Sequence, residues 1–347
     1  MLPYTAHQLG TLMNVELLGA AHSAARIWIT WERQRRNHSL SSALGAELFE
    51  IRLPGGRVGR YWRSIRRTLS ILRRHSPELV FVQNPSIVLA ALATTWGRLT
   101  RTPVVVDAHN AGVMPFEGRR AWANLLIKLI FRAARLTIVS NPALQAPVER
   151  AGGRAFALPD PMPSIGGSGV PGTAGPAQVL FICTWAPDEP YLEVIEAARL
   201  LGDGVTVHIT GRSHGRELAY GRPLPPNVVL TGFLPEHDYE SLLRRSDVVI
   251  DLTTREDCLV CGAYEAMAVG RPLLVSDTRA LRAYFDRGTL YTDNTAGDIA
   301  ARVREALGRL PALAAEMAAL REARTAEWSA RIASLERELA RIVAETR

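Results

Sequence analysis

The stretch Ile250–Asp277 combines residue types that could hold a phosphorylated ligand carrying hydroxyl groups. An apolar run is followed by an acidic loop, and a predicted helix then begins near Gly262. The first N–H groups of a helix are unpaired and the helix dipole is positive there, so they form a binding site for anions. Glu265 lies inside the first turn, where its carboxylate could bind hydroxyl groups rather than phosphate. This combination suits a nucleotide sugar.

Structural alternatives apply to the same stretch. An acid in the first turn, such as Glu265, can simply stabilise its own helix by roughly 0.3–1 kcal/mol. Cys258 and Cys261 have the spacing of a redox or zinc pair, but the sequence holds no second pair of ligands. We therefore interpret them as small, half-buried residues and predict no metal site. With Cys183 as the third cysteine, no disulfide framework is expected, and a reducing cytoplasm is the predicted location.

The elements that must position these residues form two successive α/β domains. Strand patterns alternate with helix patterns, which favours parallel sheets. A polar loop at 32–38, with Ser39 as N-cap, precedes the first predicted helix. After a weakly patterned leader of about 22 residues, we predict strands at 26–31, 48–51, 79–82, 103–107 and 136–140, and helices at 40–46, 60–74, 87–97 and 119–135.

The second half repeats the alternation after a stretch rich in Pro, Gly and Ser. The predicted organisation is a first domain at 1–160, a linker at 161–176, a second domain at 177–312, and one or two C-terminal helices at 313–347. The fold class is therefore α/β, with two Rossmann-like domains. In the second domain, strands are expected at 179–184, 205–210, 228–231, 248–252 and 273–276, and helices at 193–201, 239–244, 263–269, 279–284 and 296–307.

The composition is that of an ordinary globular protein, but its charge is unevenly placed. No run reaches the ~20 apolar residues of a membrane-spanning helix, and the N-terminus lacks the pattern of a signal peptide. Residues 1–160 carry 21 Arg or Lys and 9 Asp or Glu, a net charge of +12, whereas the rest carry 20 and 25, a net charge of −5. The basic half predicts an anionic partner, such as a membrane surface or a phosphorylated acceptor. No nucleic-acid-binding motif accompanies the charge, so nucleic acid is not an expected partner.

The run Asp257–Pro272, DCLVCGAYEAMAVGRP, resembles the motif of family 4 glycosyltransferases, in which seven residues separate an acid from a glutamate. Gly232–Pro235 and Ser246–Ile250 resemble that family's approach to the motif, and Trp328 resembles part of its closing helix. In the first half the resemblance rests on the order of elements and on Asp107–Asn110. It implies the GT-B fold, in which two Rossmann-like domains face each other across a cleft and the closing helix crosses back onto the first domain.

The resemblance also implies roles for the residues of the motif. Glu265 would bind the ribose hydroxyls of a nucleotide-sugar donor, and Asp257 would hold hydroxyls of the donor sugar. The amides at the start of the helix would face the diphosphate, because such N–H groups bind anionic oxygens. The donor-binding candidates in and before the motif are Trp185, Cys261, Gly262, Ala263, Tyr264 and Glu265.

The catalytic candidates are His109, Asp107 and Asp257. His109 resembles the family's histidine that faces the donor sugar, although a histidine at a strand end is often an ordinary polar residue. Retention of the anomeric configuration is implied only by the resemblance. An inverting enzyme would need a general base instead, for which Asp107 and Glu117 are the nearby candidates.

Departures from the family pattern concern the first acid and the phosphates. The first acid of the motif is usually glutamate, whereas here it is the shorter Asp257. The family usually places an Arg and a Lys near the start of the second domain, but the loop Thr184–Pro190 contains neither. A departing nucleoside diphosphate needs its developing charge stabilised by cations or dipoles. Arg212 and Arg255 are the predicted substitutes, with an ordinary surface arginine as the alternative for each.

Two helices of the basic half predict either contact with lipid or ordinary packing. An apolar stripe beside a basic one is typical of elements that lie on anionic membranes. The alternative is that the apolar faces pack on the sheet while the arginines lie in water. The apolar stripe of 119–135 comprises Trp122, Leu125, Leu126, Leu129 and Ile130, its basic stripe comprises Lys128, Arg132 and Arg135, and Arg63, Arg67 and Arg74 share a face of 60–74.

The expected function is the transfer of a sugar from a nucleotide-diphosphate donor to a lipid-linked or polysaccharide acceptor, in cell-envelope or exopolysaccharide synthesis. The nucleotide sugar is a co-substrate, and no further cofactor is expected. The predicted location is the cytoplasm or the inner face of the plasma membrane. Because the usual cation pair is missing, the alternative is a non-catalytic peripheral membrane or anion-binding protein on a degenerate GT-B scaffold. A GT-B epimerase is a further option, because a fold does not fix its chemistry.

Overall fold

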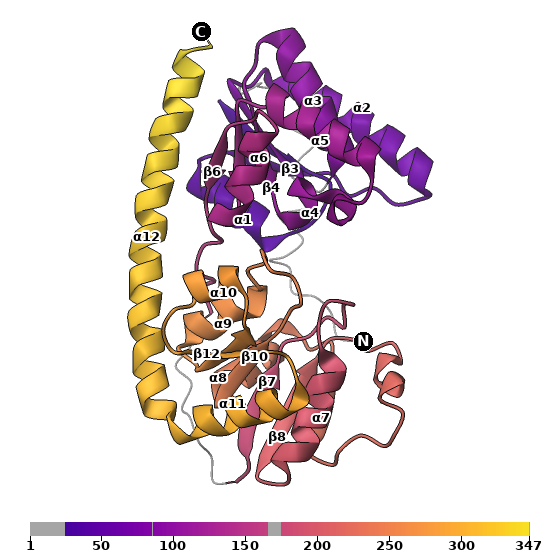
Figure 1. Cartoon of the computed structure of the whole chain (residues 1–347). Coiled ribbons are helices and arrows are strands. Elements are labelled where there is room, and N and C mark those ends of the chain that lie inside the picture. The colour runs from indigo at the N-terminus through magenta and orange to yellow at the C-terminus, as the bar shows by residue number, and fades with distance from the viewer. Residues whose placement is uncertain (1–24, 85, 166–174, 347) are drawn as a thin grey trace, which may run out of the picture.

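The computed structural model describes residues 25–84, 86–165 and 175–346, which form two α/β domains (Figure 1). The predicted N-terminal leader lies outside these residues. In the described chain, each domain is built on a sheet of six parallel strands flanked by helices. The predicted fold class, α/β with two Rossmann-like domains, is confirmed.

The first sheet has the strand order β2-β1-β3-β4-β5-β6. Its central strands are rich in Val and Ile and are buried throughout, as expected for parallel strands that are covered on both faces. The strands are β1 (Arg26–Thr30), β2 (Glu47–Glu50), β3 (Leu79–Asn84), β4 (Val104–Ala108), β5 (Leu136–Val139) and β6 (Ala155–Ala157).

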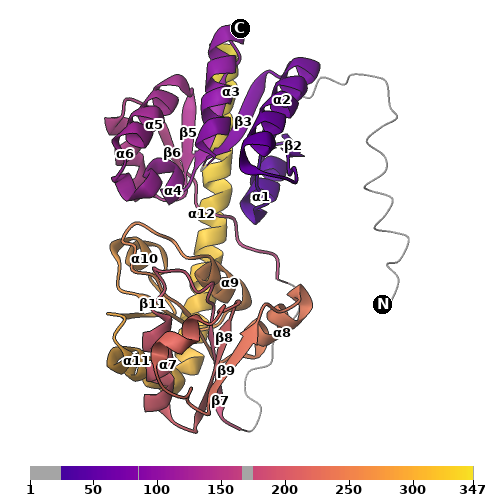
Figure 2. The same ribbon diagram turned by 90° about the vertical axis from the view of Figure 1, so that its right-hand side faces the viewer.

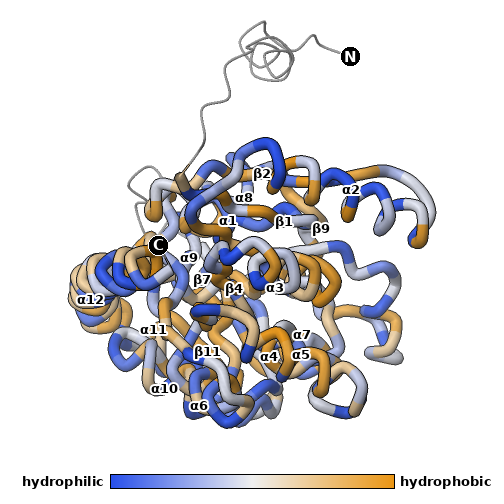
Figure 3. Tube along the Cα trace, turned by 90° about the horizontal axis from the view of Figure 1, so that it is seen from above, coloured by the Kyte–Doolittle hydropathy of each residue, from blue (hydrophilic) through white to orange (hydrophobic). Residues whose placement is uncertain are grey.

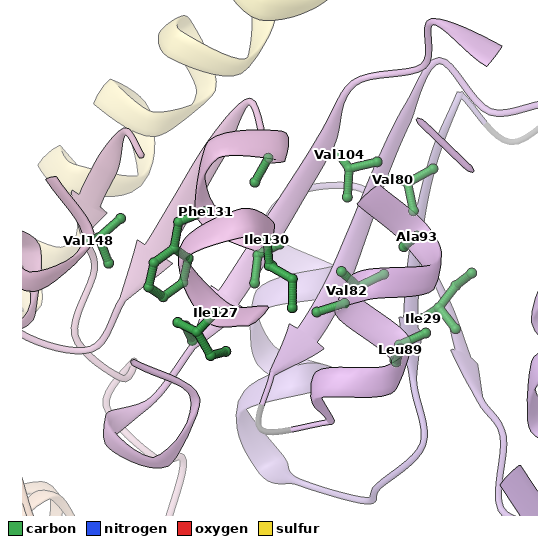
Figure 4. Close-up of a cluster of buried hydrophobic side chains, with 14 of the residues drawn as sticks. Ile29, Val80, Val82, Leu89, Ala93, Val104, Ile127, Ile130, Phe131 and Val148 are labelled. Atoms are coloured by element: carbon green, nitrogen blue, oxygen red, sulfur yellow. The ribbon is translucent and has the colours of Figure 1, made fainter. Parts of the chain in front are cut away.

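Helices cover both faces of the first sheet. One face packs against α2 (Arg57–His75), α3 (Ile87–Thr100) and α5 (Ala121–Ala133), which lie side by side in Figure 2. The opposite face packs against α1 (Arg35–Ala43) and the end of the C-terminal helix. Short helices α4 (Asn110–Val113) and α6 (Gln145–Arg150) follow β4 and β5. In the core under α3 and α5, Figure 4 labels Ile29, Val80, Val82, Leu89, Ala93, Val104, Ile127, Ile130, Phe131 and Val148.

The second sheet has the order β12-β11-β10-β7-β8-β9. The pairs α7 with α11 and α8 with α9 lie on opposite faces, and α10 shares the face of α9. The strands are β7 (Ala177–Phe181), β8 (Val205–Thr210), β9 (Val228–Gly232), β10 (Val248–Asp251), β11 (Leu273–Ser276) and β12 (Thr289–Thr292). The helices are α7 (Tyr191–Leu201), α8 (Glu236–Arg245), α9 (Cys261–Val269), α10 (Arg279–Tyr284) and α11 (Ala296–Gly308).

The C-terminal segment forms one long helix, α12 (Leu310–Ala344), which runs beside both domains in Figure 1. Figure 3 looks along this helix, where hydrophobic and hydrophilic residues alternate. Its first part buries Met317 in the second domain and its last part buries Leu339 in the first. Between them, the Trp328 indole donates a hydrogen bond to the Pro159 carbonyl at 3.2 Å. A single amphipathic helix thus connects the two cores.

The first helix differs from its prediction. The loop at 32–38 and the N-cap at Ser39 are wrong, because α1 begins at Arg35 and the Ser39 hydroxyl donates to the Arg35 carbonyl inside the helix. Residues 35–37 are polar, so apolar periodicity does not identify them as helical. Arg36 and Asn37 are nevertheless buried, because they pair with other polar groups of the core.

Several short elements were also missing from the prediction. The strands β6 and β12 have three and four residues, and α4 and α6 have four and six. Such lengths are too short to establish a period. The strand predicted at 179–184 also ends earlier, at Phe181, and residues 182–184 enter a loop.

Candidate functional site

In each sheet, the point at which the strand order reverses marks the place where a ligand is expected to bind. This reversal lies between β1 and β3 in the first sheet and between β7 and β10 in the second. In open α/β sheets, ligands bind beyond the carboxyl ends of the strands at such points. Helix α1 follows β1 and helix α9 follows β10, so both helices begin there. Arg35 of α1 and Glu265 of α9 are in contact across the domain junction.

Helix α9 begins against an internal carboxylate. Asp251 ends β10, and its Oδ2 accepts a hydrogen bond from the Gly262 amide at 2.7 Å. A Cβ at position 262 would lie 2.6 Å from both this oxygen and the Ile182 side chain, so only glycine fits. The Gly262 amide, which was expected to face a diphosphate, donates to Asp251 in this structure, whereas the role predicted for the Ala263 amide stays a prediction.

The ionisation of Asp251 follows from its position. The carboxyl group is buried, and burial raises its pKa well above the ordinary value even though the Gly262 amide favours the charged form. The nearby carboxylates Glu189 and Glu265 raise it further.

Glu265 meets groups from both domains. Its Oε1 accepts a hydrogen bond from Arg35 Nη1 at 3.1 Å, and its Oε2 accepts one from the Tyr239 hydroxyl of α8. The side chain is only 15% exposed, whereas that of Arg35 is 65% exposed. Burial raises the pKa of the Glu265 carboxyl, although Tyr239 and Arg35 act in the opposite direction. The carboxylate is thus held at the junction by one hydroxyl and one guanidinium.

Asp257 also has a protein partner. Its Oδ1 accepts from Arg279 Nη2 at 2.9 Å, at the start of α10, and its side chain is about one quarter exposed. The Asp257 carbonyl accepts a hydrogen bond from the Asn141 side chain of the first domain at 3.1 Å. The loop before α9 therefore contacts the end of β5 directly. Asp257 lies at the domain junction, as its expected role requires, but its carboxylate is paired.

Asp107 is a structural residue in this protein. It is fully buried, and both of its oxygens accept hydrogen bonds from Arg36, at 2.9–3.1 Å. The expectation that Asp107 serves as a general base is corrected, because a fully buried carboxylate in a bidentate pair cannot reach a substrate proton. His109 follows β4, with Nε2 3.8 Å from Asp107 Oδ2 and without a hydrogen-bond partner among the described residues. Its side chain is partly exposed, so it can present a ring edge to the junction.

Arg36 connects this cluster to the segment between the domains. Its Nη1 lies 2.5 Å from Asp160 Oδ1, and its Nη2 donates to the Leu158 carbonyl at 3.0 Å. Burial acts to raise the pKa of Asp160, but Arg36 and His109 outweigh it and hold that pKa below the ordinary value. The start of α1, the end of β4 and the beginning of the interdomain segment are therefore joined by one charged cluster.

Two side chains predicted to contact the donor lie in the protein interior. Trp185 is fully buried and its indole donates to the Thr210 carbonyl at 2.9 Å. Tyr264 is buried against the rings of Tyr284 and Phe285. Both predictions are corrected, because these side chains fill the core rather than line the junction.

The two arginines predicted to replace the family's cation pair contact side chains outside the start of α9. Arg255 forms an ion pair with Asp188 at 3.2 Å. Arg212 is exposed, and its guanidinium lies 5.9 Å from the ring centre of Phe233. Neither contacts Glu265 or the first turn of α9 in the described structure.

The cysteines do not gather with other metal-binding groups. In the described part of the chain, no three His, Cys, Asp or Glu side chains are arranged to hold a metal ion. Cys183 and Cys258 are unbridged, as is Cys261, which begins α9. Burial raises the pKa of the Cys258 thiol to about 11, so it stays protonated near neutral pH.

The partners of the predicted carboxylates could be found only in part from the sequence. Asp251 was within the predicted strand 248–252, and a carboxylate at the end of an apolar strand can indicate a ligand-binding site. Arg36 lay in a predicted loop, and its partner Asp107 is 71 residues away. Tyr239 lies 26 residues from Glu265. Neither of these contacts leaves a local pattern.

The sequence matches two family models. One, described as "Glycosyl transferase 4-like domain", matches residues 10–157. The other, described as "Glycosyl transferase-like", matches residues 192–337. Together they cover most of the chain, including α1 with its preceding strand and the α9 motif. No curated protein matches the sequence.

Solved structures of similar fold cover nearly the whole chain. Sucrose-phosphate synthase from Thermosynechococcus elongatus superposes with a TM-score of 0.70 at 14% identity, over 92% of this chain and 99% of that one. HepE from Anabaena, solved with UDP and glucose, gives 0.66 at 14% identity over the same shares. A glycosyltransferase from Rickettsia africae gives 0.61 at 12% identity, over 92% and 89%. With both family models matched and the two-domain fold shared, the chain belongs to the family 4-like GT-B glycosyltransferases.

Proposed function

We propose that the protein transfers a sugar from a nucleoside diphosphate donor, with a uridine diphosphate sugar as the first candidate, to a lipid-linked or saccharide acceptor. The observation that carries this proposal is Glu265, a largely buried carboxylate at the second switch point that already accepts an O–H hydrogen bond from Tyr239. Ribose hydroxyls would replace Tyr239 or Arg35 as its donors. The complex of HepE with UDP-glucose supports the choice of donor.

The other junction residues would act on the sugar. His109 follows β4 in the first domain, and Asp257 lies in the loop of the second domain that contacts β5 through Asn141. Both residues are therefore at the domain junction, beyond the carboxyl ends of the strands. Hydroxyls of the donor sugar would bind to Asp257 beside its ion pair with Arg279, and His109 would face the anomeric carbon. Retention of configuration is proposed from the family resemblance alone.

The test is release of the nucleoside diphosphate from a panel of UDP-, GDP- and ADP-sugars by the full-length protein. We expect slow hydrolysis of at least one donor in the absence of acceptor, because water can take the place of the acceptor hydroxyl. The anomer that is first released, observed by NMR, should retain the configuration of the donor. Absence of release from every donor, with or without a saccharide acceptor, contradicts the proposal.

The surface of the first domain supports a lipid-linked acceptor at an anionic membrane. Helix α5 is apolar on two sides: Ile127 and Ile130 pack on the sheet, whereas Trp122, Leu125 and Leu129 are each more than half exposed. Separate residues of one helix thus provide both sheet packing and an exposed apolar surface, which supports the proposed membrane contact. Beyond α5, Phe116 and Trp62 are also more than half exposed.

Cations accompany these apolar side chains. Arg120 lies 5.4 Å from the ring centre of Phe116, which in turn contacts the Trp122 ring. Lys128 is exposed on α5, and exposed arginines follow one another along α2. Apolar anchors beside cations match the surface of an anionic bilayer. Among the described helices, none combines the length and apolar character needed to cross a membrane.

The membrane contact predicts a selective loss of vesicle binding. Replacing Trp122, Leu125 and Leu129 by serine together should reduce sedimentation with phosphatidylglycerol vesicles by about tenfold or more. The control replaces Leu218 and Phe233, which are even more exposed residues of the second domain, by serine and should bind as the wild type does. Binding of the wild type should also weaken as salt is raised. Equal loss in both variants, or equal binding to neutral vesicles, contradicts the proposed contact.

A non-catalytic anion-binding protein is the second candidate. It is favoured by the protein partners of the donor site: Glu265 is bonded to Arg35, Asp257 to Arg279, and the start of α9 to Asp251. Vesicle binding without any nucleotide-sugar affinity, measured by calorimetry, would select this candidate. Affinity for one nucleotide sugar together with release of its nucleoside diphosphate excludes it.

A further inference from the structure

The diphosphate of the proposed donor would lie at the N-terminus of α9, where an N–H group already donates to a carboxylate of the protein. The amide of Gly262 donates to Asp251 at 2.7 Å, so this N–H group is not free for a phosphate oxygen. A helix N-terminus binds anions through such unpaired N–H groups. The start of α9 therefore has fewer N–H groups available to a phosphate than the motif suggests. The negative charge of the leaving group needs another partner.

Nearby arginines of the second domain contact other side chains in this structure. Arg255 is paired with Asp188 at 3.2 Å and Arg279 with Asp257 at 2.9 Å. Arg212 lies over the ring of Phe233 on an exposed surface. The loop Thr184–Pro190 contains no cation at all. The charge that would stabilise a departing nucleoside diphosphate has to come from another part of the chain.

Arg35 of the first domain reaches into this site. It is the first residue of α1, at the switch point of the first sheet. Its Nη1 lies 3.1 Å from Glu265 Oε1 and its Nη2 lies 3.0 Å from Glu236 Oε1, so one guanidinium bridges α9 and α8. The Arg35 and Glu236 side chains are both largely exposed, and ion pairs of this kind are weak and easily exchanged.

We propose that Arg35 is the cation that binds the donor diphosphate and stabilises the leaving group. This inference rests on the proposed function. When ribose hydroxyls bind to Glu265, they take the acceptor oxygen that Arg35 contacts in this structure, and the guanidinium is released beside the ligand. Glu265 and Gly262 are three residues apart, or about 4.5 Å along the helix axis, so the phosphates next to the ribose lie within reach of an arginine side chain.

The chemical step explains why a cation is needed there. The bond between the anomeric carbon and the β-phosphate oxygen breaks, and its electron pair stays on that oxygen. The acceptor hydroxyl oxygen forms the new bond to the anomeric carbon, and its proton is taken up by the departing diphosphate. Negative charge therefore grows on the phosphate, where a guanidinium forms paired, charge-assisted hydrogen bonds.

The test distinguishes phosphate binding by Arg35 from a purely structural role of Arg35 in holding the two domains together. Calorimetry would compare the affinity for UDP with that for uridine, and for GDP with that for guanosine, in the full-length protein. In the wild type, we expect the nucleoside diphosphate to bind more tightly than the nucleoside. In Arg35→Ala this ratio should fall about tenfold or more, while nucleoside affinity is maintained because Glu265 is freed. Arg35→Lys should retain part of the ratio.

Glu236→Gln is the matched control, because it opens the same bridge but leaves Arg35 in place. Its ratio should equal that of the wild type. Equal ratios in Arg35→Ala and the wild type, or parallel changes in Arg35→Ala and Glu236→Gln, overturn the assignment while leaving the proposed function intact. Failure of the wild type to bind any of these probes, or ADP and adenosine, overturns the proposed function, and the role of Arg35 with it.

Discussion

Replacing Arg36 by methionine is expected to lower the free energy of unfolding by about 3–5 kcal/mol. The guanidinium is buried and donates to both oxygens of Asp107, which is fully buried. It also pairs with Asp160 at 2.5 Å. Methionine fills a similar volume but leaves Asp107 without its compensating charge in the core. Chemical denaturation of the wild type and the variant measures the difference.

Arg26→Met is the matched control for this prediction. Arg26 forms an ion pair with Glu336 at 2.8 Å, but both side chains are partly exposed, so its loss should cost about 1 kcal/mol or less. Adding Asp107→Asn to Arg36→Met should recover part of the lost stability, because the uncompensated buried charge is removed. Equal losses in Arg36→Met and Arg26→Met would show that the Arg36 cluster is not a buried ion pair in solution.

The same cluster predicts a pH dependence. The pKa of Asp160 in the folded protein is held below its ordinary value by Arg36 and His109, against the effect of burial. A carboxyl group with a depressed folded pKa contributes stability above its unfolded pKa of about 4 and loses it as the pH falls through the folded value. The stability difference between wild type and Arg36→Met should therefore shrink below pH 4.

Replacing Glu265 by alanine is expected to reduce kcat/KM for the donor by about 100-fold or more. Hydrogen bonds to a charged carboxylate contribute about 1.5–3 kcal/mol each, and 1.4 kcal/mol corresponds to a factor of ten. Glu265 is mostly buried at the domain junction, so solvent cannot replace it well. Steady-state kinetics with the donor found by the release assay measures the change.

Glu240→Ala is the control for Glu265→Ala. Glu240 lies on α8 and pairs with Arg244 at 3.3 Å on its own helix, so its loss should leave kcat/KM nearly unchanged. Folding of both variants is checked by their unfolding transitions. Comparable losses of activity in the two variants would remove the special role assigned to Glu265.

The repeating parts of the fold could be predicted from the sequence because they depend on local patterns. Strands such as Val205–Thr210 and Leu273–Ser276 were placed at their observed bounds. Leu273–Ser276 is buried along its whole length, whereas Val205–Thr210 alternates buried and partly exposed residues over its first four positions, and the sequence pattern of each strand records this burial. The motif around Glu265 likewise predicted a helix, and α9 ends at Gly270, whose φ of 68° suits glycine.

The contacts that shape the site could not be predicted in this way. Arg36 looked like a loop residue because a charged side chain is normally exposed, and only Asp107, brought close by the sheet, makes its burial possible. Gly262 was assigned to phosphate, but its amide is satisfied by Asp251 and its lack of a side chain lets Ile182 pack closely. Trp185 was predicted to bind the donor, but its side chain is buried and its indole donates a hydrogen bond to the Thr210 carbonyl.

The most direct measurement is thermal stabilisation of the wild type and Glu265→Ala by UDP-, GDP- and ADP-sugars. A ligand present at about 100 times its Kd stabilises the folded protein by about 2.7 kcal/mol. We predict that one donor raises the melting temperature of the wild type and that this effect is largely lost in Glu265→Ala. Stabilisation by none of the donors, or equal stabilisation of both proteins, would contradict the assignment of Glu265 as the donor-binding carboxylate.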